Sequence, residues 1–387
     1  MSNNSNFLFI LPFYNRENWT ADYQKQTVNK LSKRYSVVVY CEYNKTYVKE
    51  LISLRKKPIR LLYKSKGVYY YSQVDLLPFI RFETVKRINA FINALLLFLL
   101  IRKNLFSKKI VVWGFHPEVA DFRKYFPFRN YSIYDCVDFF SSVIPEHSRI
   151  IKRQEKYIMN KFDLVTVNST ILLSHHKKVR ENIKLVPLGF SPPSKKITAK
   201  RSLPGDRPII GYAGALNYRL DYKLLRKLVE GNKQWMFVFW GPRQKDIQDS
   251  MFDVDKEIEY LFSLPNVIHG QSTTRDNVYS MIKQFDICII PYNTKLDFNK
   301  YCFPMKLFEY FYVGKPVMST SIKELGRYPK FIKIGDSVKE WEDGIKMLLG
   351  RSWPADSKME ERLIAEENRW EKKINEIIEL INNGKKF

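Results

Sequence analysis

The stretch PMKLFEYFYVGKPVMST, residues 304–320, predicts one repeating unit of an α/β fold. Pro304 suits the first turn of a helix, where its missing N–H is not needed, and Gly314 suits the C-cap that ends the helix. The apolar residues after Gly314 predict a buried strand. A helix over 304–313 followed by a strand over 316–319 is typical of a sheet with parallel strands.

The same alternation continues on both sides of this stretch. In the second half we expect strands at 209–213, 235–240, 266–268 and 286–290, and helices at 221–230, 274–284, 337–349 and 359–382. In the first half we expect strands at 6–11, 36–41, 110–113, 131–135, 163–168 and 183–188, and helices at 21–33 and 146–161.

Residues 189–208 interrupt the alternation, with four prolines and no apolar period, so they are typical of a linker. The predicted fold class is therefore α/β, with two Rossmann-like doubly wound domains facing across a cleft. The predicted domains are 1–190 and 209–355, joined by a linker at 191–208 and followed by a C-terminal helix at 356–387.

Length and composition agree with this organisation. A chain of 387 residues with 45% apolar and 27% charged residues fits two globular domains. The cysteines, Cys41, Cys136, Cys288 and Cys302, lie far apart, which argues against disulfides and a zinc knuckle and favours the cytosol. The N-terminal apolar run is too short and lacks the basic residues of a secretory signal.

The formal net charge of +25 is concentrated in the first half. Residues 1–190 hold 32 Lys and Arg against 14 Asp and Glu, and the remainder holds 33 against 26. This excess favours an anionic partner such as lipid, a phosphorylated substrate or nucleic acid, although an AT-biased genome would also enrich lysine. No helix-turn-helix, RNA-recognition or zinc pattern is present, so we expect no nucleic acid partner.

The longest apolar stretch is AFINALLLFLLI, residues 90–101. It is flanked by Lys86, Arg87, Arg102 and Lys103, and it is shorter than the roughly twenty residues that cross a bilayer. Two interpretations remain open: a buried core helix, or an interfacial helix whose basic ends contact lipid phosphates.

The second half carries residues suited to a nucleotide diphosphate. Gly214 follows a predicted strand and precedes Arg219, and a glycine-lined turn before a helix lets backbone N–H groups approach a phosphate. Lys306, in the first turn of the 304–313 helix, suits a diphosphate, and Glu309 suits the paired hydroxyls of a ribose. Ordinary turn glycines and a solvated Lys and Glu are the alternative explanation.

Five segments of the second half, GYAGALNYRLDYKLL, WMFVFWGP, LPNVIHG, FDICIIPY and PMKLFEYFYVGKPVMST, resemble the nucleotide-binding half of GT-B glycosyltransferases. The similarity is greatest to the group 1, or family-4-like, bacterial enzymes, including the branch with teichuronic-acid biosynthesis transferases. The resemblance implies that Glu309 holds the donor ribose and that Arg219 and Lys306 hold the diphosphate. It also implies that the nucleotide is lined by Gly214, Gly241, His269 and Tyr292.

One position departs from the family pattern. Retaining members carry E-x7-E, and the first glutamate is replaced here by Tyr301, eight positions before Glu309. The stereochemical outcome is therefore left open.

Sugar transfer also needs a base on the acceptor hydroxyl when it inverts. The loops after two predicted strands offer Asp138, Asp135 and His116 as catalytic candidates, with Asp138 preferred, and a helix-capping role is the alternative for either aspartate. Arg219 and Lys306 supply positive charge, and no D-x-D signature follows a strand in the donor half. We therefore expect no metal and no cofactor beyond the nucleotide-sugar substrate.

The loop PFYNRENW, residues 12–19, corresponds to one that contacts the acceptor in this family, although it lacks the usual glycines. With the basic first half it favours a lipid-linked glycan acceptor, such as a polyprenyl diphosphate, in bacterial surface polysaccharide synthesis. The expected location is cytoplasmic, peripheral on the inner face of the plasma membrane. Alternatives are a nucleotide-sugar 2-epimerase of the same fold and a non-catalytic transferase-like subunit.

Overall fold

The computed structural model divides the chain into two compact units. Unit 1 comprises Met1–Pro187 and Lys373–Phe387, and unit 2 comprises Leu188–Lys372. The residues that the structure describes are 7–12, 22–35, 37–44, 62–74, 76–79, 82–102, 108–126, 128–142, 148–197, 202–244, 253–271 and 274–384. Residues 13–19 of the predicted acceptor loop and Lys103 lie outside these ranges.

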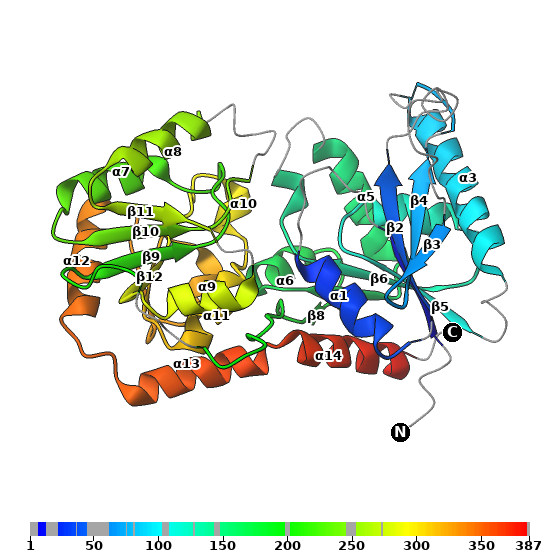
Figure 1. Cartoon of the computed structure of the whole chain (residues 1–387). Helices are drawn as coiled ribbons and strands as arrows, with labels where there is room; N and C mark the ends of the chain where they lie inside the picture. The colour runs from blue at the N-terminus through cyan, green and yellow to red at the C-terminus, as the bar shows by residue number, and fades with distance from the viewer. Residues whose placement is uncertain are drawn as a thin grey trace. The chain divides into compact units, whose positions relative to one another are not determined.

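Unit 1 is built on a sheet of eight described strands in the order β3-β4-β2-β1-β5-β6-β7-β8 (Figure 1). All neighbours are parallel except β3 and β4, which form an antiparallel pair at one edge. The strands are β1 (Phe7–Pro12), β2 (Val37–Asn44), β3 (Leu62–Ser65), β4 (Val68–Val74), β5 (Lys109–Gly114), β6 (Tyr131–Cys136), β7 (Leu164–Val167) and β8 (Lys184–Leu185).

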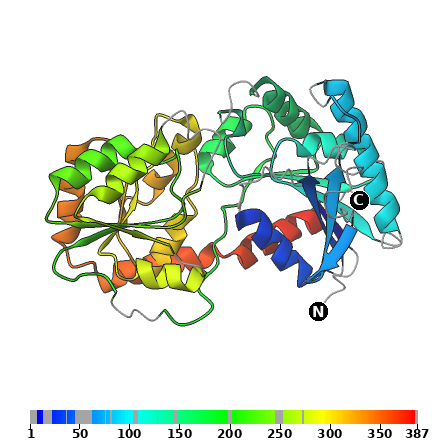
Figure 2. The ribbon, with the colours of Figure 1, turned by 45° about the horizontal axis from the view of Figure 1, so that its top comes forward.

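Helices lie on both sides of this sheet, as Figure 2 shows. They are α1 (Asp22–Ser32), α3 (Glu83–Ile101), α4 (Val119–Tyr125), α5 (Ser148–Lys161) and α6 (Thr170–His176), with a short 3-10 helix, η3 (Phe140–Ser142). The inward faces of the strands and of α3, α4 and α5 form one apolar core. Because β1 and the central part of β5 are covered on both faces, their sequences are continuously apolar, which is why they could be predicted.

Unit 2 has a second parallel sheet, in the order β11-β10-β9-β12-β13-β14. Its strands are β9 (Ile209–Ala213), β10 (Met236–Trp240), β11 (Val267–Gly270), β12 (Ile287–Ile290), β13 (Val317–Ser319) and β14 (Ile332–Ile334). Numbered along this unit, the order is 3-2-1-4-5-6, the doubly wound arrangement whose direction reverses between β9 and β12. Two Rossmann-like sheets confirm the predicted fold class.

The helices of unit 2 are α7 (Tyr222–Gly231), α8 (Val254–Ser263), α9 (Arg275–Ile282), α10 (Asp297–Lys300), α11 (Lys306–Val313), α12 (Val338–Leu349) and α13 (Ala355–Glu367), with the 3-10 helix η6 (Lys323–Arg327). Gly314 ends α11 with a φ of 75°, as predicted for a C-cap. The core joins both sides of the sheet, from Ile210 on β9 to Trp341 on α12.

The C-terminal segment differs from the single helix expected at 359–382. It forms α13 and then α14 (Trp370–Asn383), with a break at Asn368, whose backbone carbonyl accepts a hydrogen bond from Phe190 N at 2.9 Å. From Lys373 onward the chain belongs to unit 1. The chain therefore passes between the units twice, at Pro187–Leu188 and at Lys372–Lys373, where the sequence predicted one crossing.

Candidate functional site

The loops after β9 and β12 lie at the point where the strand order of unit 2 reverses. The two strands are neighbours, with Ile287 paired to Ile210 and Cys288 to Gly211. Ligands of doubly wound sheets bind at the carboxyl ends of the strands at such a reversal. Gly214 and Arg219 follow β9, and Tyr292 follows β12, so three of the predicted donor residues come from these two loops.

Lys306, in the first turn of α11, also lies beside the loops after β9 and β12. Its Nζ donates a hydrogen bond to the Tyr292 hydroxyl and lies 4.6 Å from the centre of that ring and 5.1 Å from the Tyr212 ring. Burial alone would lower the pKa of Lys306, but the adjacent Tyr212 and Tyr292 phenols outweigh it and raise the pKa above its ordinary value. Lys306 is therefore a cation at neutral pH.

Arg219 places a second cation on the same tyrosine. Its guanidinium carbon lies 4.6 Å from the Tyr292 ring centre and 4.7 Å from the Phe298 ring centre. Its Nε donates to Asn299 Oδ1 at 2.8 Å, and Asn299 Nδ2 donates back to the Arg219 carbonyl at 2.9 Å. These contacts fix the direction of the guanidinium, so two positive groups from distant parts of the sequence converge on Tyr292.

Tyr310 fixes the register of α11 against the sheet, a role that the sequence analysis missed. Its hydroxyl accepts a hydrogen bond from Ala213 N at 3.0 Å and lies 3.4 Å from the carbonyls of Ala213 and Ile289. The side chain is fully buried. Because Tyr310 sits one turn after Lys306, it holds the amino end of the helix beside the ends of β9 and β12.

Glu309 lies on the first turn of α11 and faces a partner that the sequence did not indicate. Its Oε1 is 3.7 Å from a guanidinium nitrogen of Arg275, the first residue of α9. The Glu309 side chain is 23% exposed and the Arg275 side chain 32% exposed, so both are accessible to a ligand. A lone arginine after a helix-capping threonine carries no motif, which is why Arg275 could not be found from sequence.

The predicted glycines bring backbones close together. A Cβ on Gly241 would lie 2.0 Å from the Gly214 carbonyl oxygen, and one on Gly214 would lie 2.9 Å from Lys306 Cε. Gly241 N donates to Gly270 O at 2.7 Å, and Gly214 N donates to Trp240 O at 3.0 Å. Glycine is thus required by packing at the carboxyl ends of β9 and β10, and Lys306 extends directly over Gly214.

Two other positions named in the sequence analysis have partners of their own. His269 is exposed on β11 and stacks on Phe262 of α8, with ring centres 3.9 Å apart and an interplanar angle of 2°. Tyr301 follows α10 and has the Lys323 Nζ 4.9 Å from its ring centre. The position of the missing family glutamate is therefore occupied by an aromatic ring with a cation over it.

In unit 1, His116 follows β5, next to the reversal of strand order between β1 and β5. Its Nδ1 lies 3.3 Å from both the Glu118 backbone N and the Glu118 Oε2. The first contact needs Nδ1 as an acceptor and the second needs it protonated, so the two belong to different tautomers. His116 and Glu118 are both half-buried, and the His116 ring meets Phe140 edge-on at 4.7 Å.

The prediction of Asp135 as a catalytic base is wrong. Asp135 lies within β6 rather than in the loop after it and is fully buried. Its Oδ1 accepts hydrogen bonds from Lys373 Nζ at 3.1 Å and from Thr166 Oγ1 at 2.9 Å. This buried ion pair attaches α14 to the sheet of unit 1 and leaves no access for an acceptor hydroxyl.

Asp138 lies just beyond β6 and is half-buried. Its carbonyl accepts a hydrogen bond from Phe140 N at 3.0 Å. The loop continues into a cluster in which Phe139 meets His175 edge-on at 4.9 Å and Cys136 Sγ lies 3.7 Å from His176 Nε2. Burial lowers the pKa of His176 to about 4, so this histidine is neutral and structural at pH 7.

Unit 2 also has a cavity of about 560 Å³ at the opposite end of its strands. It is lined by residues at the amino ends of β9, β12 and β13, including Arg207, Asp286 and Lys315. It is therefore separate from the donor residues, which follow the carboxyl ends of the strands. In the described part of the chain, no three His, Cys, Asp or Glu side chains gather as a metal-binding set.

Comparison with solved structures shows the class of fold. The chain matches the sucrose-phosphate synthase of Thermosynechococcus elongatus with a TM-score of 0.73 at 13% identity, covering 97% of this chain and 98% of that one. It matches a trehalose-phosphate synthase of Burkholderia xenovorans, solved with glucose-6-phosphate, with a TM-score of 0.69 at 11% identity over 98% of this chain and 100% of that one. The chain has the GT-B fold of glycosyltransferases, as the resemblance predicted.

The chain is also similar to a third solved structure and to a protein known by sequence. HepE of Anabaena, solved in complex with UDP and glucose, matches with a TM-score of 0.67 at 12% identity over 97% of this chain and 99% of that one. In sequence, the chain is 27% identical over 265 residues to the Bacillus subtilis protein named teichuronic acid biosynthesis glycosyltransferase TuaH. That match covers 62% of this chain and 63% of the relative, less than two thirds of its length. No protein-family model matches the sequence.

Proposed function

We propose that this protein is a glycosyltransferase that moves a sugar from a nucleotide diphosphate donor to a glycan acceptor. The observation that carries the proposal is the convergence of Lys306 and Arg219 on Tyr292, at the reversal point of the unit 2 sheet. Two fixed cations beside a helix amino terminus suit a diphosphate, and they would stabilise it as a leaving group. The similarity to TuaH over 265 residues supports the same function.

In the proposed reaction, a bond forms between the acceptor oxygen and the anomeric carbon, and the bond from that carbon to the diphosphate oxygen breaks. The electron pair leaves with the nucleotide diphosphate, whose added charge Lys306 and Arg219 balance. Glu309 holds the two ribose hydroxyls, for which it must exchange its long contact with Arg275 for shorter hydrogen bonds. Gly214 and Gly241 leave the backbone open to the phosphates.

The acceptor proton needs a base, and we propose His116 ahead of Asp138. With Nδ1 protonated toward Glu118 Oε2, the other ring nitrogen can accept a proton, and the carboxylate stabilises the imidazolium that forms. The loop that carries His116 follows β5, where the strand order of unit 1 reverses. Replacing His116 by Gln should lower kcat far more than replacing Asp138 by Asn, at similar donor KM.

For the acceptor, we propose a lipid-linked glycan, such as a polyprenyl diphosphate carrier, in the synthesis of a bacterial surface polysaccharide. The charge excess of residues 1–190 supports a phosphate-bearing acceptor, and the name of the TuaH relative supports a cell-wall polymer. We propose that the enzyme works in the cytoplasm, at the inner face of the membrane.

The test is to incubate the full chain with diphosphate sugars of uridine, guanosine and adenosine and with a bacterial lipid extract. Mass spectrometry should show release of one nucleotide diphosphate and a lipid heavier by one sugar residue. The Lys306→Gln variant should lose this activity, whereas Lys339→Gln, at an exposed lysine of α12, should keep it. Conversion of the donor into an isomer without transfer would indicate a 2-epimerase, and no consumption of any donor would refute the proposed reaction.

A further inference from the structure

Helix α3, Glu83–Ile101, combines a high apolar content with low burial. It has 19 residues, and its length and composition would allow it to cross a membrane. Only 28% of its most apolar 18-residue window is buried inside the protein. A core helix of a soluble domain would be mostly buried, so the exposed apolar surface needs a different explanation.

One face of α3 is built into unit 1. Ala94, Leu97 and Ile101 are fully buried and belong to the apolar core of the unit. On the same face, the Asn93 side chain oxygen lies 3.2 Å from the Tyr71 hydroxyl of β4, which donates to the Asn93 carbonyl at 3.0 Å. A helix with this face in the fold of the unit cannot also be surrounded by lipid on all sides.

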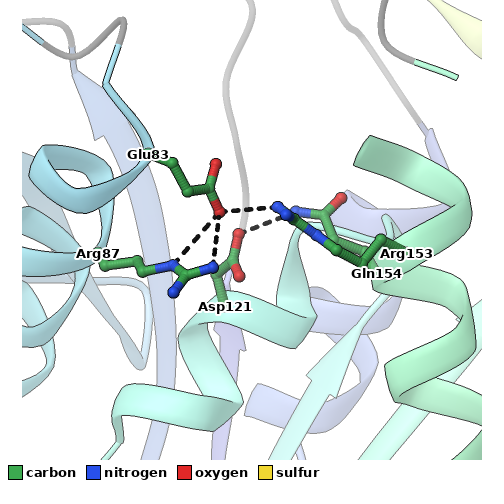
Figure 3. Close-up of polar contacts among 5 residues, drawn as sticks. All are labelled: Glu83, Arg87, Asp121, Arg153 and Gln154. Carbon is green, nitrogen blue, oxygen red and sulfur yellow. Dashed lines mark hydrogen bonds and ion pairs between the residues drawn. The ribbon is translucent and has the colours of Figure 1, made fainter. Parts of the chain in front are cut away.

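The amino end of α3 is anchored by a polar contact with α5, which in turn contacts α4 (Figure 3). Glu83 accepts from Arg87 one turn later and from Arg153 of α5 at 2.8 Å. Beside it, Gln154 of α5 donates to Asp121 of α4 at 2.9 Å. These contacts tie α3, α4 and α5 together, so the helix keeps its place in unit 1.

The opposite face of α3 carries a stripe of exposed apolar side chains. Ile88, Phe91, Leu95 and Leu99 are 42%, 48%, 40% and 45% exposed and follow one another by three or four residues, which places them on one side of the helix. Phe79 and Phe82, 65% and 54% exposed, precede the helix. We call these six residues the α3 apolar face.

Exposed cations lie near both ends of α3. Lys86 lies in the first turns and Arg102 directly follows the helix, and both are exposed. Arg123 and Lys124 lie in the last turn of α4, the helix that packs against α3. An apolar surface with cations around it matches the interface of a bilayer with anionic headgroups, where aliphatic side chains enter the acyl region and cations contact phosphates.

We propose that α3 lies in the plane of an anionic lipid membrane, with the α3 apolar face in the acyl boundary and its buried face still packed in unit 1. The protein is thus monotopic: the helix lies on one leaflet and does not span. Membrane attachment then depends on unit 1 and not on the nucleotide site, which lies in unit 2.

The experiment is flotation of the full chain with vesicles of equal parts phosphatidylglycerol and phosphatidylcholine. The double variant Leu95→Ser/Leu99→Ser should bind about tenfold less tightly or worse, because two large apolar groups no longer leave water. The matched control is Met359→Ser/Leu363→Ser on α13, whose side chains are 61% and 58% exposed, and it should bind like the wild type. Circular dichroism and thermal unfolding establish that both variants fold.

Charge is tested with Lys86→Glu/Arg102→Glu, which should weaken binding to these vesicles and remove most of its salt dependence. Vesicles of phosphatidylcholine alone should bind the wild type weakly. Unchanged binding of the Leu95→Ser/Leu99→Ser variant would overturn the proposal. Resistance to extraction at alkaline pH would show a spanning helix instead. If the wild type binds no vesicles and forms oligomers that this variant abolishes, the face is a protein contact and the proposal is wrong.

Loss of vesicle binding with retained donor binding would leave the proposed transferase function intact. Conversely, a protein that binds vesicles through α3 but accepts no nucleotide sugar would refute the function and keep this inference.

Discussion

Glu309 is the residue for which the chemistry is most specific. Its carboxylate lies on the first turn of α11 and is 23% exposed, with Oε1 3.7 Å from a guanidinium nitrogen of Arg275, a distance longer than the hydrogen bonds that two ribose hydroxyls would make. We expect Glu309→Ala to raise the donor KM about 5- to 150-fold, equivalent to about 1–3 kcal/mol, because the sugar hydroxyl pair loses its hydrogen-bond acceptor.

The matched control for Glu309 is Arg275→Gln. It removes the neighbouring cation without touching the carboxylate, so donor KM should change less than in Glu309→Ala. Initial rates at varied donor concentration measure both variants. Equal donor affinity in wild type and Glu309→Ala would remove this residue from the site.

The burial of Glu361 predicts that the stability of the protein depends on pH. It is fully buried on α13, where its Oε2 accepts from Trp353 Nε1 at 3.0 Å, and burial raises its pKa from 4.5 to about 8. The folded state therefore holds a proton that the unfolded state releases above pH 4.5. The stability from this group is complete below pH 4.5 and is lost as the pH rises toward 8.

Glu361→Gln replaces the protonated acid by an uncharged amide of the same shape. The difference in unfolding free energy between the variant and the wild type should grow by about 4 kcal/mol between pH 4.5 and 8, in favour of the variant. Urea unfolding across this range measures it. Parallel pH profiles for the two proteins would show that Glu361 is ionised in the folded state.

The close backbone contact between Gly214 and Gly241, at the ends of β9 and β10, predicts that a larger residue at position 241 destabilises the protein. A Cβ at residue 241 would lie 2.0 Å from the backbone oxygen of Gly214, and a backbone atom cannot rotate away. Gly241→Ala should destabilise the protein by about 1–3 kcal/mol and weaken donor binding through the displaced Gly214. Gly326→Ala, where no atom lies within 4 Å of the added carbon, should change stability by less than about 0.5 kcal/mol. Equal effects in urea unfolding would contradict the packing argument.

The attachment of α14 to β6 depends on the buried pair of Lys373 and Asp135, with side chains 2% and 0% exposed. Lys373→Met leaves an uncompensated carboxylate and should cost about 3–5 kcal/mol. Lys372→Met, which removes only a half-exposed ion pair with Glu367, should cost about 1 kcal/mol or less.

Adding Asp135→Leu to Lys373→Met should restore much of the lost stability, because the lone charge is removed. Unfolding free energies of the wild type, Lys373→Met, Asp135→Leu and the double variant form a double-mutant cycle. A Lys373→Met variant as stable as the wild type would mean that Asp135 has another partner in solution.

The strands could be predicted because doubly covered parallel strands are continuously apolar, as in β9, β10 and β12. The edge pair β3 and β4 was missed because YYYSQV is partly polar and only one of its neighbours is parallel. The break between α13 and α14 was also missed, because Asn368 pairs with Phe190, 178 positions away, and no local residue signals that contact. Helix α3 was located, with its role left open.

The site residues likewise comprise some that sequence motifs indicated and some that only tertiary contacts reveal. Lys306, Arg219 and Tyr292 could be proposed from their motifs and lie together in the structure. Lys373, which pairs with Asp135, is 238 positions away, so the buried Asp135 and the half-buried Asp138 looked alike in sequence. Arg275 and Tyr310 act through tertiary contacts that have no spacing signature.

The whole molecule has the fold of GT-B glycosyltransferases along nearly its full length, although identity to the solved structures is only 11–13%. Fold alone does not fix the reaction, because proteins with one fold can carry out different reactions. The proposed function therefore depends on whether unit 2 binds a nucleotide diphosphate through Arg219, which follows β9, and Lys306 of α11.

The most direct measurement is calorimetric titration of the full chain with UDP, GDP and ADP, repeated with Lys306→Gln and with Lys339→Gln. We expect saturable binding of at least one of these nucleotide diphosphates. Lys306→Gln should weaken this binding about tenfold to hundredfold, and Lys339→Gln should leave it unchanged. Absence of binding by all three, or equal affinity in Lys306→Gln and wild type, would contradict the proposed function.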